Sequence, residues 1–244
     1  MNSIVTPPPL RCISSMATRQ LLTRLAGLFH DETGVEVQLE SVGGVDAARR
    51  LQAGEIFDVA VLASDAIAAL RADATLAAGG VETVALSFVA AAVRQGRAPV
   101  PVDTLPRLTA MLLDCASIGY STGPSGKALL TRLDSWGILD TLRSRLVQAP
   151  PGRPVAAMVA GGEVDIGFQQ LSEMIRAPGI AIVSKLPPEA EILTAFDAAE
   201  CRAATRPDAE TARAFIRFLC SDAAIAVKLD EGLFPASGPS GPAA

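Results

Sequence analysis

The amino-acid sequence predicts an α/β protein made of two doubly wound lobes that are joined by two crossover strands. In the first eighty residues, short apolar runs alternate with helical patterns, which is the βαβ rhythm of a parallel sheet. The same rhythm starts again after residue 100. A long strand-like run, 84–94, separates the two halves, and a second run, 191–198, precedes the last helices. We expect these two runs to carry the chain from one lobe to the other and back.

Apolar periodicity defines the elements of the first half. Leucines and a phenylalanine recur at helical spacing from residue 21 and predict a helix from about Ala17 to Gly34. Alternation at 35–39 predicts a half-buried strand, and the apolar run 58–62 predicts a parallel strand that is covered on both faces. We further expect a strand at 10–13 with a turn at Ser14–Ser15, a helix through Ala47 to Gly54, and a helix capped by Ser64 or Asp65.

The second half is read in the same way. We expect strands at 117–121, 164–168 and 180–183, and a helix through Leu129 and Trp136. Pro154 suits the first turn of a helix that ends at Gly161 or Gly162. Helices at 208–220 and 223–229 would return to the first lobe, and a Pro/Gly-rich tail would follow.

Charge and residue counts exclude several functions. The net charge is −5, and no basic run offers the face that non-specific nucleic-acid binding needs. The four cysteines contain no CxxC pair, and His30 is the single histidine, so we expect no metal site, no cofactor and no Ser-His-Asp or Cys-His catalysis. The cysteines read as small core residues of a reduced compartment; they are Cys12, Cys115, Cys201 and Cys220.

The N-terminal segment has neither the basic start nor the apolar run of a signal peptide, and three prolines interrupt it. No stretch reaches the ~20 apolar residues of a membrane span. We therefore expect a cytoplasmic protein as the sequence is written, and a periplasmic one if the true N-terminus lies upstream.

Three strand-to-helix turns share one chemistry. Each places Ser, Thr or Gly directly before a helix, where unpaired N–H groups and the helix dipole favour an anion. Ser, Thr and Gly are also ordinary helix caps, so one such turn alone would say little. The candidate ligand-binding residues in these turns are Ser14, Ser15, Gly43, Gly44, Ser121, Thr122, Ser125 and Gly126.

A few charged residues lie in or near these turns. Lys127 could bind a carboxylate or serve as a base, and it could equally be a solvated residue of a first helical turn. Arg19 and Arg153 have the same two interpretations. Glu173 could be a general base or a solvated helix residue. If the protein is an enzyme, Lys127 and Glu173 are the candidate catalytic residues.

The chain resembles the periplasmic molybdate-binding proteins and their relatives among the type II solute-binding proteins. The resemblance spans about residues 10–235 and rests on CISSMATRQLLTRLAGLFHDETGVEVQLESVGG, LQAGEIFDVAVLAS, YSTGPSGKALLTRLDSWGI, VAGGEVDIGFQQLSEM and FIRFLCSDAAIAVKLDEGLFP. It implies a monomer with one lobe of residues 10–86 plus 197–236, another of 87–196, and a ligand between the lobes. We expect the two ends of the chain, 1–9 and 237–244, to be disordered tails. A partner ABC permease is implied if the protein is exported.

The resemblance also assigns ligand turns. Ser14 and Ser15 match the first turn of the family, Gly43–Gly44 the second, Ser125 the third and 152–154 the fourth. Gln170 falls where molybdate binders have a tyrosine, and the second turn lacks their serine.

Two functions follow from these departures. YSTGPSG and GFQQLSEM are more similar to a branch associated with organic acids, which resembles bacterial aconitate isomerases. One hypothesis is therefore the binding of a small anion, either a molybdate-like oxyanion or a di- or tricarboxylate. The alternative is a cofactor-independent isomerase that shifts a proton next to carboxylates.

Overall fold

The computed structural model describes residues 8–97, 102–183, 186–202 and 209–236. Apart from Pro8 and Pro9, the two predicted disordered tails lie outside these ranges. The described residues form two compact units: one up to Leu86 and from Ala195 onward, the other from Ser87 to Thr194. The chain passes between the units within strands β4 (Leu76–Arg94) and β9 (Leu193–Cys201).

Unit 1 contains the sheet order β2-β1-β3-β9, in which β1 is parallel to β2 and β3 while β9 is antiparallel to β3. Its other elements are β1 (Leu10–Ser15), η1 (Met16–Thr18), α1 (Arg19–Thr33), β2 (Val37–Val42), α2 (Gly44–Gln52), β3 (Val59–Ala63), α3 (Ser64–Ala72), α9 (Ala209–Leu219), η4 (Asp222–Ala224) and α10 (Ile225–Asp230).

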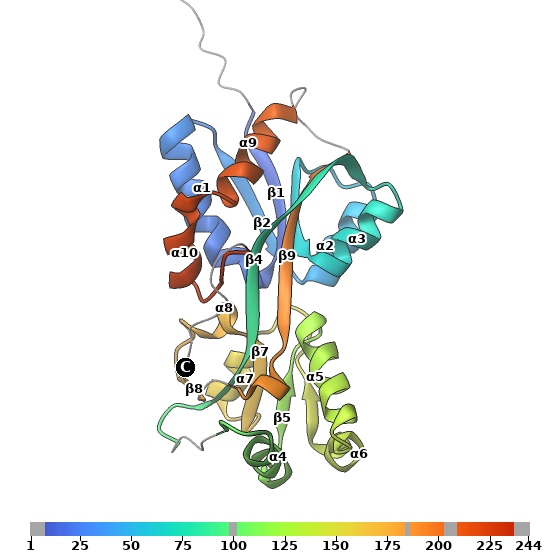
Figure 1. The fold of residues 1–244 in the computed structure, drawn as a ribbon, viewed down its shortest axis with the longest axis vertical. Helices are drawn as coiled ribbons and strands as arrows, with labels where there is room; N and C mark the ends of the chain where they lie inside the picture. The colour runs from blue at the N-terminus through green and yellow to red at the C-terminus, as the bar shows by residue number, and fades with distance from the viewer. Residues whose placement is uncertain (1–7, 98–101, 184–185, 203–208, 237–244) are drawn as a thin grey trace, which may run out of the picture. The chain divides into compact units, whose positions relative to one another are not determined.

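Helices cover both faces of this sheet. Helices α1, α9 and α10 lie together and share one apolar core, while α2 and α3 cover a second core that contains Phe57 (Figure 1). All five residues of β3 are buried, as the apolar run predicted for a strand covered on both faces. Helix α1 ends where Gly34 adopts a left-handed conformation and donates its N–H to the backbone carbonyl of His30.

Unit 2 has its own sheet. Strand β4 pairs with β7 and β8 in antiparallel fashion, and β5 is parallel to both β6 and β7. Its elements are α4 (Leu105–Asp114), β5 (Ile118–Tyr120), α5 (Pro124–Ser135), α6 (Leu139–Leu142), η2 (Arg143–Arg145), β6 (Leu146–Gln148), α7 (Val155–Gly161), β7 (Ile166–Gln170), α8 (Leu171–Met174), β8 (Ile180–Ile182) and η3 (Pro188–Ala190).

Two cores stabilise unit 2. Helices α4 and α5 supply leucines to the core that contains Phe168, and Trp136 and Tyr120 pack against it. A second core contains Met158 of helix α7 and Met174 of helix α8. No helix of the described residues is long and apolar enough to cross a membrane.

Three local expectations are wrong. Ser14 and Ser15 are the last residues of β1 and not a turn after it. Ser64 begins α3 without capping it, because its hydroxyl donates to the carbonyl of Ala195 at 3.2 Å. Cys220 is exposed at the end of α9, whereas the other three cysteines are buried.

Candidate functional site

Hydroxyl groups meet at the carboxyl ends of β1 and β2 in unit 1. Ser14 is fully buried, and its Oγ lies 2.8 Å from the Oγ of Ser41, its register partner on β2. Sequence reasoning missed Ser41. The signal was the alternation of the strand, which continues two residues beyond Leu39 and places Ser41 beside Ser14 in a parallel pair. Ser41 therefore supplies the hydroxyl that the Val-Gly-Gly turn lacks.

The three other predicted turn residues of unit 1 are Ser15, Gly43 and Gly44. Ser15 is buried and its Oγ lies 3.5 Å from the Oγ1 of Thr18, which itself donates to the carbonyl of Ser15. A Cβ atom on Gly44 would lie 3.8 Å from the Cβ of Ser15, so the first and second turns are in contact. Gly43 is the N-cap of α2.

The start of α2 keeps backbone donors. The N–H of Ala47 bonds to the carbonyl of Gly43, so the N–H groups of residues 44–46 precede the first intrahelical bond. Asp46 lies in this first turn and forms an ion pair with Arg49. The helix start can therefore donate to an anion, although a carboxylate of the chain already lies close to it.

A second hydroxyl pair lies at the end of β5 in unit 2. The Oγ atoms of Ser121 and Ser125 are 2.7 Å apart, and Ser125 is buried. A Cβ on Gly126 would lie 1.9 Å from the carbonyl oxygen of Ser121, so this turn requires glycine. Thr122, which follows Ser121 in this turn, is exposed.

Helix α5 offers few backbone donors, contrary to the expectation for this turn. Pro124 has no N–H, and the N–H groups of Gly126 and Lys127 both bond to the carbonyl of Gly123. In this turn, the hydroxyls of Ser121 and Ser125 are therefore better placed than the helix amides to bind an anion. The side chain of Lys127 is exposed in the first turn of α5.

Of the two predicted arginines, Arg153 is paired with a carboxylate, whereas Arg19 lines a groove together with Ser41 of the first hydroxyl pair. Arg153 lies in the turn before α7 and forms an ion pair with Glu163, so its positive charge is already paired within unit 2. Arg19 begins α1 and is exposed.

The end of β7 carries a connected group of amides and a carboxylate. The Nε2 of Gln169 donates to the Oε1 of Glu173 at 2.8 Å, and the Oε1 of Gln169 accepts the N–H of Ala156 in the first turn of α7 at 3.3 Å. Burial raises the pKa of Glu173 to about 7, against a smaller lowering by the Gln169 hydrogen bond. Glu173 is thus half-buried and hydrogen-bonded in α8. Because Tyr120 is the register partner of Phe168, this group adjoins the Ser121 turn.

Gln170 is buried beside Gln169. Its Nε2 donates to the Oγ1 of Thr194 at 2.7 Å, and among the described residues its Oε1 has no partner. The Thr194 hydroxyl can accept a hydrogen bond from the Nε2 of Gln170 or donate one to its Oε1. The amide of Gln170 can therefore rotate by half a turn and keep its bond to Thr194. Gln170 can therefore turn its Nε2 toward an anion. The Oγ of Ser172 is likewise buried without a partner in the described part of the chain.

In the ranges that the structure describes, no three His, Cys, Asp or Glu side chains come together as a metal site. His30 lies exposed in the last turn of α1. The chemistry of the candidate site thus consists mainly of hydroxyls, amides and one carboxyl group with a raised pKa, and the exposed Arg19 lies near Ser41.

Comparisons with solved structures show the fold. The periplasmic molybdate-binding protein of Azotobacter vinelandii matches with a TM-score of 0.77 and 21% identity, over 93% of this chain and 100% of that one. Iron-bound HitA from Pseudomonas aeruginosa matches with a TM-score of 0.69 and 15% identity, over 96% and 88%. The predicted type II solute-binding fold is confirmed.

Sequence comparison shows a nearer relative. Aconitate isomerase from Pseudomonas sp. is 33% identical over 232 residues, which are 93% of this chain and 87% of that protein. The family model described as bacterial extracellular solute-binding protein matches residues 10–233, and the chain belongs to this family.

Proposed function

We propose that this chain binds a small organic anion with two or three carboxylates, and that neutral donors hold those carboxylates. The relative at 33% identity supports this ligand class, because its name specifies aconitate, a tricarboxylate. The molybdate-binding neighbour shares 21% identity, which supports the fold and not its ligand. The same donors suit a tetrahedral oxyanion, so molybdate is the competing ligand in the test below.

The observation that carries the proposal is the pair of hydroxyls at the strand ends of each unit. Ser14 pairs with Ser41, and Ser121 pairs with Ser125. When Ser121 or Ser125 donates to the other, one hydroxyl hydrogen of that pair is left to donate to a ligand. In unit 1 the Ser41 hydrogen is left for a ligand when Ser14 donates to Ser41 in place of its long bond of 3.4 Å to the carbonyl of Ser15. Carboxylates accept such bonds with more strength than a neutral acceptor does. Gln170 supplies a further buried amide in unit 2.

A thermal-shift series tests the proposal. Citrate, cis-aconitate and trans-aconitate are compared with molybdate, tungstate, sulfate and phosphate. At a ligand concentration of about 100 times Kd, binding adds roughly 2.7 kcal/mol to the stability of the folded state. A shift with the tricarboxylates supports the proposal, and a shift with molybdate or tungstate alone contradicts it.

A second candidate function is isomerisation of an unsaturated tricarboxylate, and the environment of Glu173 favours it. A carboxylate whose pKa lies near 7 can accept a proton from the carbon next to a substrate carboxylate and return it to the far carbon of the double bond. The double bond moves by one position along the carbon chain. The same proton is removed and returned, so the reaction needs no cofactor. Gln169 fixes one oxygen of Glu173, whereas Lys127 is exposed and has no such support.

Turnover and binding are separated by one substitution. Glu173→Gln keeps the shape of the side chain and removes the base, so it should abolish conversion of trans- to cis-aconitate while the ligand-induced thermal shift persists. Glu189→Gln, on an exposed carboxylate of the same unit, is the matched control. Full activity of Glu173→Gln would exclude Glu173 as the base. No turnover by the unmodified chain would leave binding as its function.

We also propose that an ABC permease is the partner if the protein is exported. The cytoplasmic location expected from the sequence stays a prediction, and fractionation of cells with an antibody against the chain measures it.

A further inference from the structure

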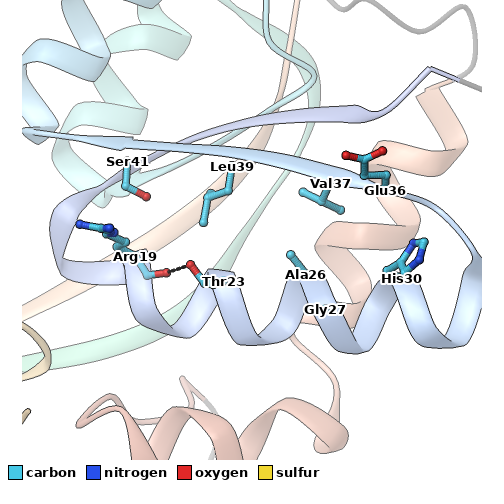
Figure 2. A pocket seen from close by; sticks show the side chains of 9 residues that line it. All are labelled: Arg19, Thr23, Ala26, Gly27, His30, Glu36, Val37, Leu39 and Ser41. Atoms are coloured by element: carbon cyan, nitrogen blue, oxygen red, sulfur yellow. Dashed lines mark hydrogen bonds between the residues drawn. The ribbon is translucent and has the colours of Figure 1, made fainter.

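An open groove of about 780 Å³ runs between helix α1 and strand β2 of unit 1. Figure 2 shows the side chains of Val37, Leu39 and Ser41 directed toward the helix across this groove. The groove is lined by Arg19, Thr23, Ala26, Gly27, His30, Glu36, Val37, Leu39 and Ser41. Of the residues that line it, only Ser41 also belongs to the hydroxyl pairs of the proposed anion site.

Among the described residues, no strand pairs with the outer edge of the strand that forms one wall. Strand β2 is the last strand of its sheet and pairs with β1 on one side. The N–H of Leu10 bonds to the carbonyl of Glu36, so even-numbered residues of β2 direct their backbone groups toward β1. The N–H and C=O groups of Val37, Leu39 and Ser41 therefore point away from β1, at the open edge. Such a row of groups is a template for one more strand.

The helical wall contains a glycine that folding does not require. Gly27 lies in the interior of α1, where glycine costs about 1 kcal/mol relative to alanine. A Cβ at this position would meet no atom within 4 Å. No contact thus explains the glycine, but together with Ala26 it leaves the helix side of the groove without a large side chain opposite Val37 (Figure 2).

Charges mark the two ends of the groove. Arg19 lies beside Ser41, is exposed, and has no ion pair with any residue in the described ranges. The dipole of α1 adds positive potential at this end. Glu36 and His30 lie at the other end, and Glu36 is exposed. An extended chain with a carboxylate at one end and a cation at the other complements this arrangement.

We propose that the groove binds an extended peptide segment of a partner protein, which adds to β2 as a further strand. Its backbone bonds to Val37, Leu39 and Ser41, and alternate apolar side chains enter the groove above Gly27. An acidic group of the peptide lies beside Arg19. This mode of strand addition obtains affinity from the main chain and selectivity from alternate side chains.

The probes are two fluorescein-labelled peptides, Lys-Val-Thr-Val-Thr-Val-Asp and its reverse, which place the aspartate beside Arg19 in the parallel and antiparallel directions. Binding is measured by fluorescence polarisation on the full chain, and backbone amide exchange is followed by NMR. We expect one peptide to bind saturably below about 1 mM and to protect the amides of residues 37, 39 and 41. The amides of residues 38, 40 and 42 already bond to β1 and should not change.

Two matched pairs of variants complete the test. Leu39→Pro removes an outward N–H that β1 does not use, so it should weaken binding at least about tenfold relative to Leu39→Ala. Gly27→Gln fills the groove and should weaken binding at least about tenfold relative to Gly27→Ala. Both substitutions replace a helical glycine and should make α1 more stable, so a loss of binding would not reflect unfolding of the helix. The proposal is overturned if neither peptide binds, or if binding survives both Leu39→Pro and Gly27→Gln.

Discussion

The raised pKa of Glu173 makes a quantitative prediction about stability and pH. The carboxyl group titrates near 4.5 when exposed and at about 7 in the folded chain, where burial disfavours its charged form. At about 1.4 kcal/mol for each pH unit, this difference corresponds to roughly 3 kcal/mol. Because Glu173 is half-buried, solvent screening reduces our expectation to about 2 kcal/mol.

The sign follows from proton linkage. Below about pH 4.5 the carboxyl group is protonated in both the folded and the unfolded chain. Between 4.5 and 7 only the unfolded chain loses the proton, so the stability of the folded state falls as the pH rises. Above about pH 7 the loss is complete. Glu173→Gln removes this contribution and should flatten the decline by about 2 kcal/mol.

Urea unfolding at several pH values measures the effect. Trp136 is the single tryptophan and packs against a core of unit 2, so its fluorescence reports the unit that holds Glu173. The difference between the unmodified chain and Glu173→Gln cancels the other titrating groups, and Glu189→Gln is the control. Identical pH profiles for the chain and for Glu173→Gln would refute the reasoning.

Three further substitutions are expected to act in different directions. Ser125→Ala breaks the pair with Ser121 and should weaken binding of the tricarboxylates about tenfold in a thermal-shift titration, with a stability loss near 1 kcal/mol. Gly126→Ala places a Cβ against the Ser121 carbonyl and should lower the unfolding free energy by more than about 3 kcal/mol in urea. Gly27→Ala should raise the midpoint of thermal unfolding, since it stabilises α1 by about 1 kcal/mol and meets no neighbour.

Sequence patterns predicted the fold because its elements depend on local periodicity. Helix α1 follows the leucine spacing, and its end follows from Gly34, which has a left-handed conformation. Strand β3 follows from an unbroken apolar run. The βαβ rhythm then restricts the topology, since parallel strands need helical crossovers.

The candidate site was less predictable because it depends on register and burial. Ser41 acts through its place opposite Ser14, which appears only when the two strands are aligned. Gln169 matters because tertiary packing brings it to Ala156 while it also bonds to Glu173, four residues along the chain. Burial of Glu173 depends on the elements around α8, and nothing in LSEM distinguishes it from a solvated glutamate.

The nature of the donors has a consequence for salt dependence. The chain carries a net charge of −5, so its overall field repels a tricarboxylate. If Lys127 and Arg153 were the main ligands, added salt would screen their attraction and weaken binding. If hydroxyls and amides are the ligands, there is no attraction between full charges for salt to weaken. Salt then mainly screens the repulsion between the ligand and the net negative charge of the chain, since the Debye length is about 10 Å at 0.1 M.

We therefore expect the affinity for a tricarboxylate to stay constant or to rise slightly when NaCl increases from about 0.05 to 0.5 M. Isothermal titration calorimetry at constant pH measures it, with Lys127→Met as the matched variant that removes one nearby cation. A large loss of affinity with salt, diminished in Lys127→Met, would show that a full positive charge holds the ligand. The exposed Lys127 and the pairing of Arg153 with Glu163 argue for the first result, since neither cation is buried beside a hydroxyl pair.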